Sequence, residues 1–338
     1  MKSILKVLQY LLPVGIAVLL LYLAFKNINF AEFLENLNLV DYRWVIFSIA
    51  LSIVGYLARA YRWNLLITPL GYHPTLYKTT LSVLVGYLAN LALPRLGEVV
   101  RCGIVKRTSN IPINVSLGSV IAERVIDLFS LTVLILIALF LEFEVLYDFV
   151  VGSFSVNLYL VSVLAIIFLV SGALGIWIFS KFQKRGRFEA LRNFLLGLRE
   201  GLISLRKVRS PMGFVLSTIV LWSVYYFMSY TIIFSLSSTS HLSMTTGLLL
   251  LVVGGIAISL PVQAGFGTYH TMIASLLTIY SIEEVTGLFL ATLLHTSQVV
   301  AVAIFGGLAL ILSLLVTPDN ESDKTKNSYS EGSPDVGQ

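Results

Sequence analysis

The fold is decided by a polar break in an apolar stretch, Leu93-Pro94-Arg95-Leu96-Gly97-Glu98-Val99-Val100-Arg101, which lies in the middle of residues 77–105. A second break, Leu260-Pro261-Val262-Gln263-Ala264-Gly265-Phe266-Gly267, lies in the middle of residues 245–280. Proline ends a helix and glycine permits tight turns, so neither stretch is expected to form one regular helix. Non-helical backbone at membrane depth is tolerated only inside protein or beside a water-filled cavity. We therefore predict two re-entrant helical hairpins, with two kinked full spans as the alternative.

The composition indicates that these breaks belong to a membrane protein. Of 338 residues, 57% are hydrophobic and 12% are charged, about half of the ~25% charged residues that soluble domains carry. This composition excludes a soluble enzyme, a disordered chain and a nucleic-acid-binding protein. The single cysteine, Cys102, excludes an intramolecular disulfide and a cysteine-rich metal site. We attribute the net charge of +5 to cytoplasmic loops rather than to an anionic ligand.

Six further apolar stretches are long enough to cross a bilayer, which takes about 20 mostly apolar residues. They are about 4–25, 43–62, 116–141, 157–180, 211–236 and 285–316. Lys2 and Lys6 precede the first, as in a signal peptide, but its apolar run is long and no small-residue cleavage site follows, so we favour a retained helix. The prediction is an all-α integral membrane protein with one polytopic domain over 1–316 and a disordered polar tail over 317–338.

The basic residues predict the orientation. With the N- and C-termini in the cytoplasm, 18 of the 23 basic residues fall in cytoplasmic segments, nine of them within 181–209. Only Lys26 and Arg43 fall in segments on the outer side of the membrane. This satisfies the positive-inside rule. It also requires the stretch 77–105 to return to the side from which it entered, which favours the hairpin. We expect the protein to lie in the cytoplasmic (inner) membrane.

The same order of elements occurs twice, in the halves 1–141 and 157–316. Each half has two spans, a hairpin and a span, and the halves have opposite orientations, which is typical of inverted-topology repeats in transporters. Thr79-Thr80 and Thr245-Thr246 precede the two breaks at nearly equal spacing, which is weak support. Residues 188–207, between the halves, predict either an amphipathic helix on the inner leaflet or a plain linker helix.

Six ionisable residues remain inside the predicted membrane region, all from the first hairpin and the span that follows it. They are Arg95, Glu98, Arg101, Glu123, Arg124 and Asp127. Such residues are costly in a bilayer and are functional candidates. Helical spacing puts the first three on one face and the two acids of 123–127 on another. The set is formally neutral. It predicts either a structural ion-pair network or a site in which Arg95 or Arg101 binds an anionic headgroup and the acids hold the arginines in place.

The second tip offers backbone amides and small residues instead of charges. Its candidates for substrate binding are Gln263, Gly265, Gly267 and Tyr269, which face the charged hairpin across the predicted pseudo-symmetry. The helix that follows would direct its positive dipole end toward the bilayer midplane.

Other polar residues of the spans are assigned to structural roles. Arg59, Arg62 and Trp63 lie at the predicted cytoplasmic end of a span, where snorkelling and interfacial anchoring explain them. His295 and Gln298 lie three residues apart in the last span, where interhelical hydrogen bonding is favoured and a proton relay is the alternative. The four histidines lack paired carboxylates at metal-ligand spacing, and no phosphate-binding loop or nucleophile elbow is present, so we expect no metal and no cofactor.

Taken in order, four segments resemble a known family: Arg59-Ala60-Tyr61-Arg62-Trp63-Asn64-Leu65-Leu66, then Leu93 to Arg101, then Glu123-Arg124-Val125-Ile126-Asp127, then Pro261 to Tyr269. They are similar to the transmembrane region of lysylphosphatidylglycerol synthases, a flippase-like domain family, over about residues 5–315. The resemblance implies an inner-membrane protein that moves a lipid, or a lipid-linked group, between leaflets. Full-length aminoacyl-lipid synthases carry their transferase in a separate soluble domain, for which the polar tail leaves no room. Some relatives are associated with polyprenyl-phosphate sugar metabolism.

We therefore expect flippase- or scramblase-like movement of a lipid through a polar midplane site, without an ATPase or transferase domain of the chain's own. The partners are membrane lipids, anionic or polyprenyl-phosphate-linked, and no nucleic acid. The alternative is a membrane component of glycolipid or aminoacyl-lipid synthesis, acting as a transferase or as the partner of a soluble or membrane synthase. The sequence gives no oligomeric state.

Overall fold

The computed structural model of the chain describes residues 22, 35–93, 95–153, 208–260, 262 and 265–317. Regular structure in these ranges is entirely helical, with nine α-helices, three short 3-10 helices and no strand, in agreement with the predicted all-α fold. Apart from residues 22 and 317, the predicted spans 4–25 and 157–180, the predicted helix 188–207 and the tail 317–338 lie outside the described residues.

Four of the described helices are long and apolar enough to cross a membrane. They are α3 (Tyr42–Ile67), α6 (Ile113–Leu141), α10 (Pro211–Ile232) and α13 (Glu284–Leu315). The first and third continue into short 3-10 helices, Thr68–Leu70 and Ile233–Ser235, and another 3-10 helix, Asn36–Leu39, precedes α3. These helices correspond to four of the six predicted spans, although α3 runs on to Ile67 instead of ending at residue 62.

Each of the two predicted breaks separates a pair of shorter helices. The first pair is α4 (Leu76–Ala92) and α5 (Leu96–Ser109), and the second is α11 (Met244–Ser259) and α12 (Thr268–Ile279). The short helix α7 (Phe143–Ser153) follows α6. Both helix breaks confirm the local effect expected from proline and glycine. Pro94, Pro261, Gln263 and Ala264 themselves lie outside the described residues.

Side-chain caps fix the starts of several helices. The side chains of Asp41, Thr75, Ser210 and Ser243 each accept a hydrogen bond from a backbone N–H in the first turn of α3, α4, α10 and α11. A cap of this kind satisfies one of the N–H groups that a helix leaves without an intrahelical acceptor. The starts of these helices are therefore encoded locally.

The first pair is held together by contact between two backbones. A Cβ atom added to Gly97 would lie 2.1 Å from the carbonyl oxygen of Gly86, so only glycine fits there. Asn90 Oδ1 accepts a 2.6 Å hydrogen bond from the N–H of Gly97, which ties the end of α4 to the start of α5. Arg95, between the two helices, has a φ of 61°, a left-handed conformation that is strained for a residue other than glycine.

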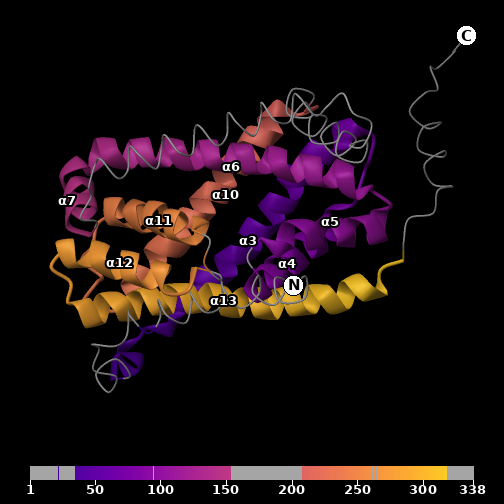
Figure 1. The fold of residues 1–338 in the computed structure, drawn as a ribbon. Coiled ribbons are helices and arrows are strands. Elements are labelled where there is room, and N and C mark those ends of the chain that lie inside the picture. The colour runs from indigo at the N-terminus through magenta and orange to yellow at the C-terminus, as the bar shows by residue number, and fades with distance from the viewer. Residues whose placement is uncertain are drawn as a thin grey trace, which may run out of the picture.

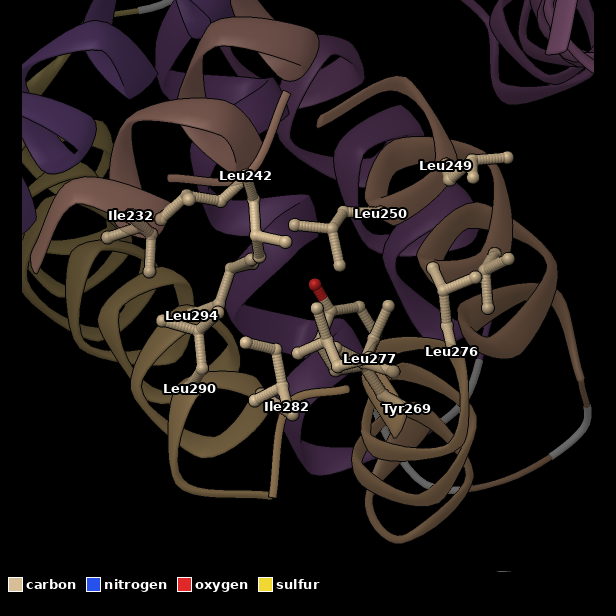
Figure 2. Packing of buried hydrophobic residues seen from close by; sticks show 14 of the residues in the cluster. Ile232, Leu242, Leu249, Leu250, Tyr269, Leu276, Leu277, Ile282, Leu290 and Leu294 are labelled. Carbon is tan, nitrogen blue, oxygen red and sulfur yellow. The ribbon is translucent and has the colours of Figure 1, made fainter. Parts of the chain in front are cut away.

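The two short pairs lie between α6 and α13, with α4–α5 along one half of these long helices and α11–α12 along the other (Figure 1). Helices α3 and α10 cross diagonally between them and pack against each other, with Gly55 of α3 facing Val224 of α10. The main apolar core fills the space between α11, α12 and α13 (Figure 2).

The outer surface of the long helices is apolar. On α6, the side chains of Phe129, Leu136 and Phe140 are 66%, 60% and 87% exposed. An exposed apolar surface of this extent is expected where lipid, not water, surrounds a protein.

Candidate functional site: a buried arginine–carboxylate cluster beside a cavity

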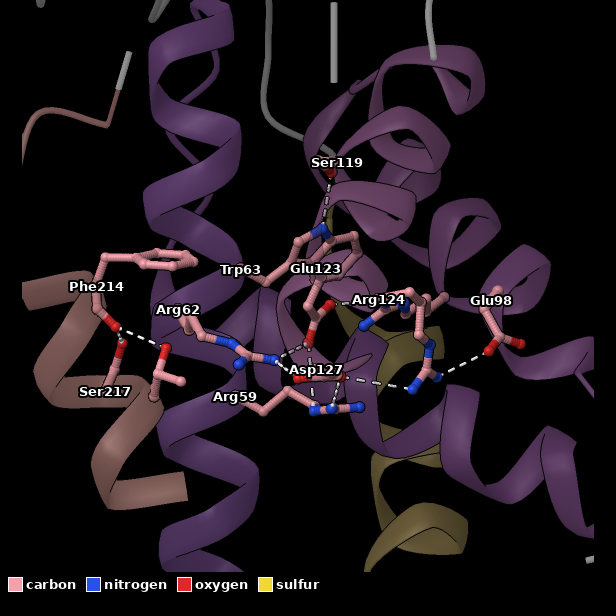
Figure 3. Close-up of polar contacts among 12 residues, drawn as sticks. Arg59, Arg62, Trp63, Glu98, Ser119, Glu123, Arg124, Asp127, Phe214 and Ser217 are labelled. Atoms are coloured by element: carbon pink, nitrogen blue, oxygen red, sulfur yellow. Dashed lines mark hydrogen bonds and ion pairs between the residues drawn. The ribbon is translucent and has the colours of Figure 1, made fainter. Parts of the chain in front are cut away.

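Two carboxylates of α6 bind two arginines of α3 (Figure 3). Arg62 Nη2 lies 3.1 Å from Glu123 Oε1 and 2.5 Å from Asp127 Oδ1. Arg59 Nη2 lies 2.5 Å from Asp127 Oδ2, and its Nε lies 3.3 Å from Glu123 Oε1. The spacing of three residues on α3 and of four on α6 puts each pair on one helix face. The predicted shared face of Glu123 and Asp127 is therefore confirmed.

The first broken pair joins the same cluster through α5. Arg101 Nη2 donates a 2.8 Å hydrogen bond to Glu123 Oε2, and Arg124 Nη2 donates a 2.8 Å hydrogen bond to Glu98 Oε1. Arg124 Nη1 also lies 3.7 Å from Asp127 Oδ2. Glu123 and Asp127 thus each contact three arginines. The interactions connect α3, α5 and α6, and we call these seven side chains the ion cluster: Arg59, Arg62, Glu98, Arg101, Glu123, Arg124 and Asp127.

Burial in the ion cluster is graded. Arg62 and Glu123 are fully buried, whereas the side chains of Asp127, Glu98 and Arg124 are 14%, 21% and 44% exposed. The guanidinium of Arg101 lies 4.7 Å from the ring centroid of Trp63, within range of a cation–π interaction. Arg62 and Glu123, at the buried end, join neighbouring helices. Glu98 and Arg124, at the other end, are exposed enough to contact a ligand.

The assignment of Arg59, Arg62 and Trp63 to interfacial anchoring is wrong. Arg59 is 5% exposed, Arg62 and Trp63 are 0% exposed, and Trp63 Nε1 donates a 2.9 Å hydrogen bond to the buried Ser119. These side chains lie in the last turns of α3 but are packed against other helices, so they are not available to the membrane surface. The signal that could have found them is the match between two arginines three residues apart and two acids four residues apart.

This correction changes the charge of the site. The predicted set of six residues was neutral, but the ion cluster contains four arginines and three carboxylates, a net charge of +1. Arg95 is exposed, and no ion pair or hydrogen bond joins it to the cluster in the described part of the chain. It lies at the strained break before α5. Of the three residues predicted to share a face, Glu98 pairs with Arg124, Arg101 pairs with Glu123, and Arg95 joins neither pair.

Several polar atoms of the ion cluster are buried without a hydrogen-bond partner in the described structure. Four are guanidinium donors, Arg59 Nε, Arg62 Nε, Arg62 Nη1 and Arg101 Nε, and one is an acceptor, Glu98 Oε2. A buried donor without an acceptor costs about 1–3 kcal/mol. The ion cluster therefore has an excess of donors and of positive charge.

A cavity of about 540 Å³ adjoins the ion cluster. Arg59, Arg124 and Asp127 line it at one side, and most of its remaining wall is apolar or aromatic. Helices α3, α4, α6, α10, α11, α12 and α13 all contribute lining residues. The ends of α4 (Asn90 and Leu91) and of α11 (Ile258 and Ser259) both contribute to this wall, so both helix breaks adjoin one cavity.

The aromatic side of the cavity carries polar groups. The hydroxyl groups of Tyr87 and Tyr225 lie 3.4 Å apart, and the Arg59 guanidinium lies 5.8 Å from the centre of the Tyr87 ring. Trp222 Nε1 is a buried donor without a hydrogen-bond partner in the described structure. The cavity thus combines hydrogen-bonding groups with apolar surface, as ligand pockets generally do.

The second break reaches the cavity through Tyr269, which is 3% exposed and lines its wall. Gly265 and Gly267 have φ angles of 76° and 84° and form the turn before α12, without lining the cavity. Gln263 lies outside the described residues. His295 and Gln298 also line the cavity. Within the described ranges, no group of three or more His, Cys, Asp or Glu side chains is placed to hold a metal ion.

The family model for the lysylphosphatidylglycerol synthase TM region matches residues 10–306. The chain belongs to this family. The match includes the ion cluster and both helix breaks, and it confirms the resemblance drawn from the sequence motifs. No significant match to a curated protein or to a solved structure accompanies it. The lysylphosphatidylglycerol synthase TM region and the apolar helices together identify an integral membrane protein related to lipid synthesis or lipid flipping.

Proposed function

We propose that this protein moves a lipid with an anionic headgroup between the leaflets of the cytoplasmic membrane. The observation that carries the proposal is the cavity of about 540 Å³, in which a net-positive ion cluster adjoins an apolar wall. A lipid has a matching pair of parts, a charged headgroup and apolar hydrocarbon chains. Its headgroup would bind beside Arg59 and Arg124, while its hydrocarbon chains would stay among the apolar side chains and the surrounding lipid.

The charge of the ion cluster supports ligand binding beyond a purely structural role. A buried network that only tied helices together would be most stable with balanced charges and satisfied donors. This cluster has one more arginine than carboxylates, and it retains buried guanidinium donors without acceptors. Arginine suits a phosphodiester because its planar fork can donate two hydrogen bonds to two oxygens. An anionic headgroup would supply both the missing charge and the missing acceptors.

Each candidate residue has a role in this proposal. Arg95, at the strained break, would meet the headgroup first, and Arg59, Arg124 and Asp127 would contact it in the cavity. Arg62, Glu98, Arg101 and Glu123 would hold the contacting side chains in position. Tyr269, and with it the turn of Gly265 and Gly267, would close the opposite side, and Gln263 stays a candidate from the sequence.

We further propose that both broken pairs are re-entrant hairpins within an inverted repeat of residues 1–141 and 157–316, with both termini in the cytoplasm. Two features support this topology. Each pair lies along only half of α6 and α13 (Figure 1), and the ends of α4 and α11 adjoin the same cavity. Discontinuous helices that meet at a shared site are typical of transporters built from inverted repeats.

The test is a leaflet-exposure assay in proteoliposomes with fluorescent phosphatidylglycerol, and with phosphatidylcholine as the zwitterionic comparison. We expect the wild-type protein to accelerate exchange of the anionic lipid. Arg59→Gln should slow this exchange on the order of tenfold, which corresponds to about 1.4 kcal/mol. Arg107→Gln, at an exposed arginine near the end of α5, is the matched control and should retain the wild-type rate.

Arg95→Gly separates transport from folding, because glycine relieves the strained φ of 61° while the charge is lost. We expect this variant to be at least as stable as the wild type and slower in transport. If wild-type proteoliposomes move no lipid faster than protein-free liposomes, the proposal is wrong.

A further inference from the structure

Two buried imidazole rings lie side by side at the second break. His270 of α12 and His295 of α13 are 2% and 5% exposed, and their ring centroids lie 5.0 Å apart. Phe266 and Tyr269 pack against His295 at centroid distances of 4.7 and 5.3 Å. The N–H of Gly267 donates a 3.3 Å hydrogen bond to His270 Nδ1, which leaves Nε2 as the protonated nitrogen of the neutral ring.

One ring of the pair, that of His295, lies in the wall of the cavity that adjoins the ion cluster. His295 lines this cavity directly, as does Tyr269 beside it, and the cluster residues Arg59, Arg124 and Asp127 line it as well. A change of charge on the imidazoles therefore acts on the same cavity in which the headgroup is proposed to bind. Electrostatic interactions across such a space are stronger than in water.

Ionisable groups from several elements line the cavity together with His295. Helix α3 contributes Tyr56 and Arg59, α4 contributes Tyr87, α6 contributes Arg124 and Asp127, α10 contributes Tyr225, and α12 contributes Tyr269. The part of α11 that lines the cavity carries no ionisable side chain. The acids of α7, Glu144 and Asp148, are exposed at the surface of that helix.

Histidine is the side chain whose unperturbed charge changes between about pH 5 and 8. The carboxylate of the cavity wall, Asp127, is already bound by arginines, and a tyrosine hydroxyl is ordinarily neutral at physiological pH. Among the groups that line the described cavity, His295 can therefore take up a proton without breaking an ion pair, and His270 lies directly beside it.

We propose that the His270–His295 pair binds a proton together with the anionic headgroup, so that lipid movement is coupled to proton movement. This inference rests on the proposed function. With the cavity empty, Arg59 and Arg124 outnumber Asp127 and oppose a further positive charge. A bound anion reverses that effect, and the coupling is reciprocal, so a proton on the pair tightens binding of the anion by the same factor.

One proton per headgroup has an electrical consequence. The proton binds an imidazole nitrogen when the headgroup enters the cavity and leaves when the headgroup is released at the other leaflet. A phosphodiester with one negative charge then crosses together with one positive charge. The pair of ions does no work against the membrane potential, which otherwise amounts to about 2.3 kcal/mol per charge per 100 mV.

The first experiment needs no transport. Phosphatidylglycerol is added to the purified full-length protein in weakly buffered detergent solution, with a pH indicator, and lipid binding is measured in the same sample. We expect uptake of up to one proton per bound lipid, and binding that tightens on acidification by at most about tenfold per pH unit, the limit for one linked proton. Phosphatidylcholine should cause no uptake.

The chain supplies matched variants for this experiment. His270→Gln and His295→Gln remove the buried rings, and His73→Gln and His241→Gln alter exposed histidines elsewhere. We expect proton uptake to be lost in the first two variants and retained in the last two. Phosphatidylglycerol binding without proton uptake, or uptake that persists in both buried variants, overturns the coupling and leaves the proposed function standing. A wild-type protein that binds no phosphatidylglycerol overturns both.

In proteoliposomes, an imposed pH gradient should accelerate wild-type exchange of phosphatidylglycerol in the direction of proton flow. His295→Gln should make the rate independent of the gradient, while His241→Gln should respond as the wild type does. A wild-type rate that ignores the gradient but follows the membrane potential contradicts proton coupling.

Discussion

Arg62 is the residue on which the ion cluster depends most. Its guanidinium is fully buried, and its Nη2 contacts Glu123 on one side and Asp127 on the other. A buried charge is tolerated only while it is paired, and the loss of one partner leaves the other charges uncompensated. The two carboxylates belong to α6, so Arg62, together with Arg59, joins α3 to α6.

We predict that Arg62→Met lowers the free energy of unfolding by about 3–5 kcal/mol, the usual cost of breaking a buried ion pair. Thermal or denaturant unfolding of the detergent-solubilised protein measures the change. Arg107→Met is the control, since this arginine is exposed and should be replaceable at little cost. Equal stability of the two variants would contradict the central role of Arg62.

At the scale of the element, the first broken pair depends on one backbone contact. Gly86 and Gly97 approach so closely that no side chain fits between α4 and α5, and Asn90 caps the start of α5 in the same place. The position of α5 in turn fixes Glu98 and Arg101 relative to α6. A change at Gly97 should therefore affect residues of the ion cluster that it does not touch.

We predict that Gly97→Ala destabilises the protein by about 1–3 kcal/mol, the usual cost of overpacking, and slows lipid exchange. Gly103→Ala is the control in the same helix, because a Cβ atom there meets nothing within 4 Å and alanine favours a helix by up to about 1 kcal/mol over glycine. Unfolding and the leaflet-exposure assay together decide the outcome. A Gly97→Ala variant as stable and active as Gly103→Ala would refute the packing argument.

The elements were easier to predict from the sequence than the site. Apolar length gave the four described spans, and Leu93-Pro94 and Leu260-Pro261 marked both breaks, because these are local signals. Arg62 and Glu123 are 61 residues apart, and Arg59 and Asp127 are 68 residues apart. Such pairing depends on how helices pack, so the sequence predicted the acids of α6 as candidates but assigned their arginine partners to the membrane surface.

At the scale of the whole molecule, the cavity joins two chemically different breaks. The first break positions charges of α5 in the ion cluster beside the cavity. The second contributes Tyr269 of α12 to the cavity wall, next to the histidine pair of α12 and α13. The two halves of the inverted repeat that we propose therefore share an order of helices but carry different side chains at their breaks. The difference allows one side of the cavity to bind an anion and the other to bind a proton.

We predict that filling the cavity blocks transport without disturbing the ion cluster. Val299 lines the cavity, whereas its neighbour Val300 is 41% exposed on the outer side of α13. Val299→Phe should slow exchange of phosphatidylglycerol several-fold, and Val300→Phe should leave the rate unchanged. The proteoliposome assay measures both, with unfolding as the control for stability. Slowing by both variants alike would indicate that the cavity is not the path of the headgroup.

The contact between Gly86 and Gly97 also bears on mechanics. Gly306 of α13 approaches α4 in a similar way, since a Cβ atom there would lie 3.0 Å from the carbonyl oxygen of Leu84. Helices whose backbones touch cannot slide past each other without losing that contact, so α4, α5 and the adjoining part of α13 are expected to move as one rigid body. The ion pairs of Arg101 with Glu123 and of Arg124 with Glu98 connect this body to α6 through side chains alone, so we expect any relative movement to occur at that boundary.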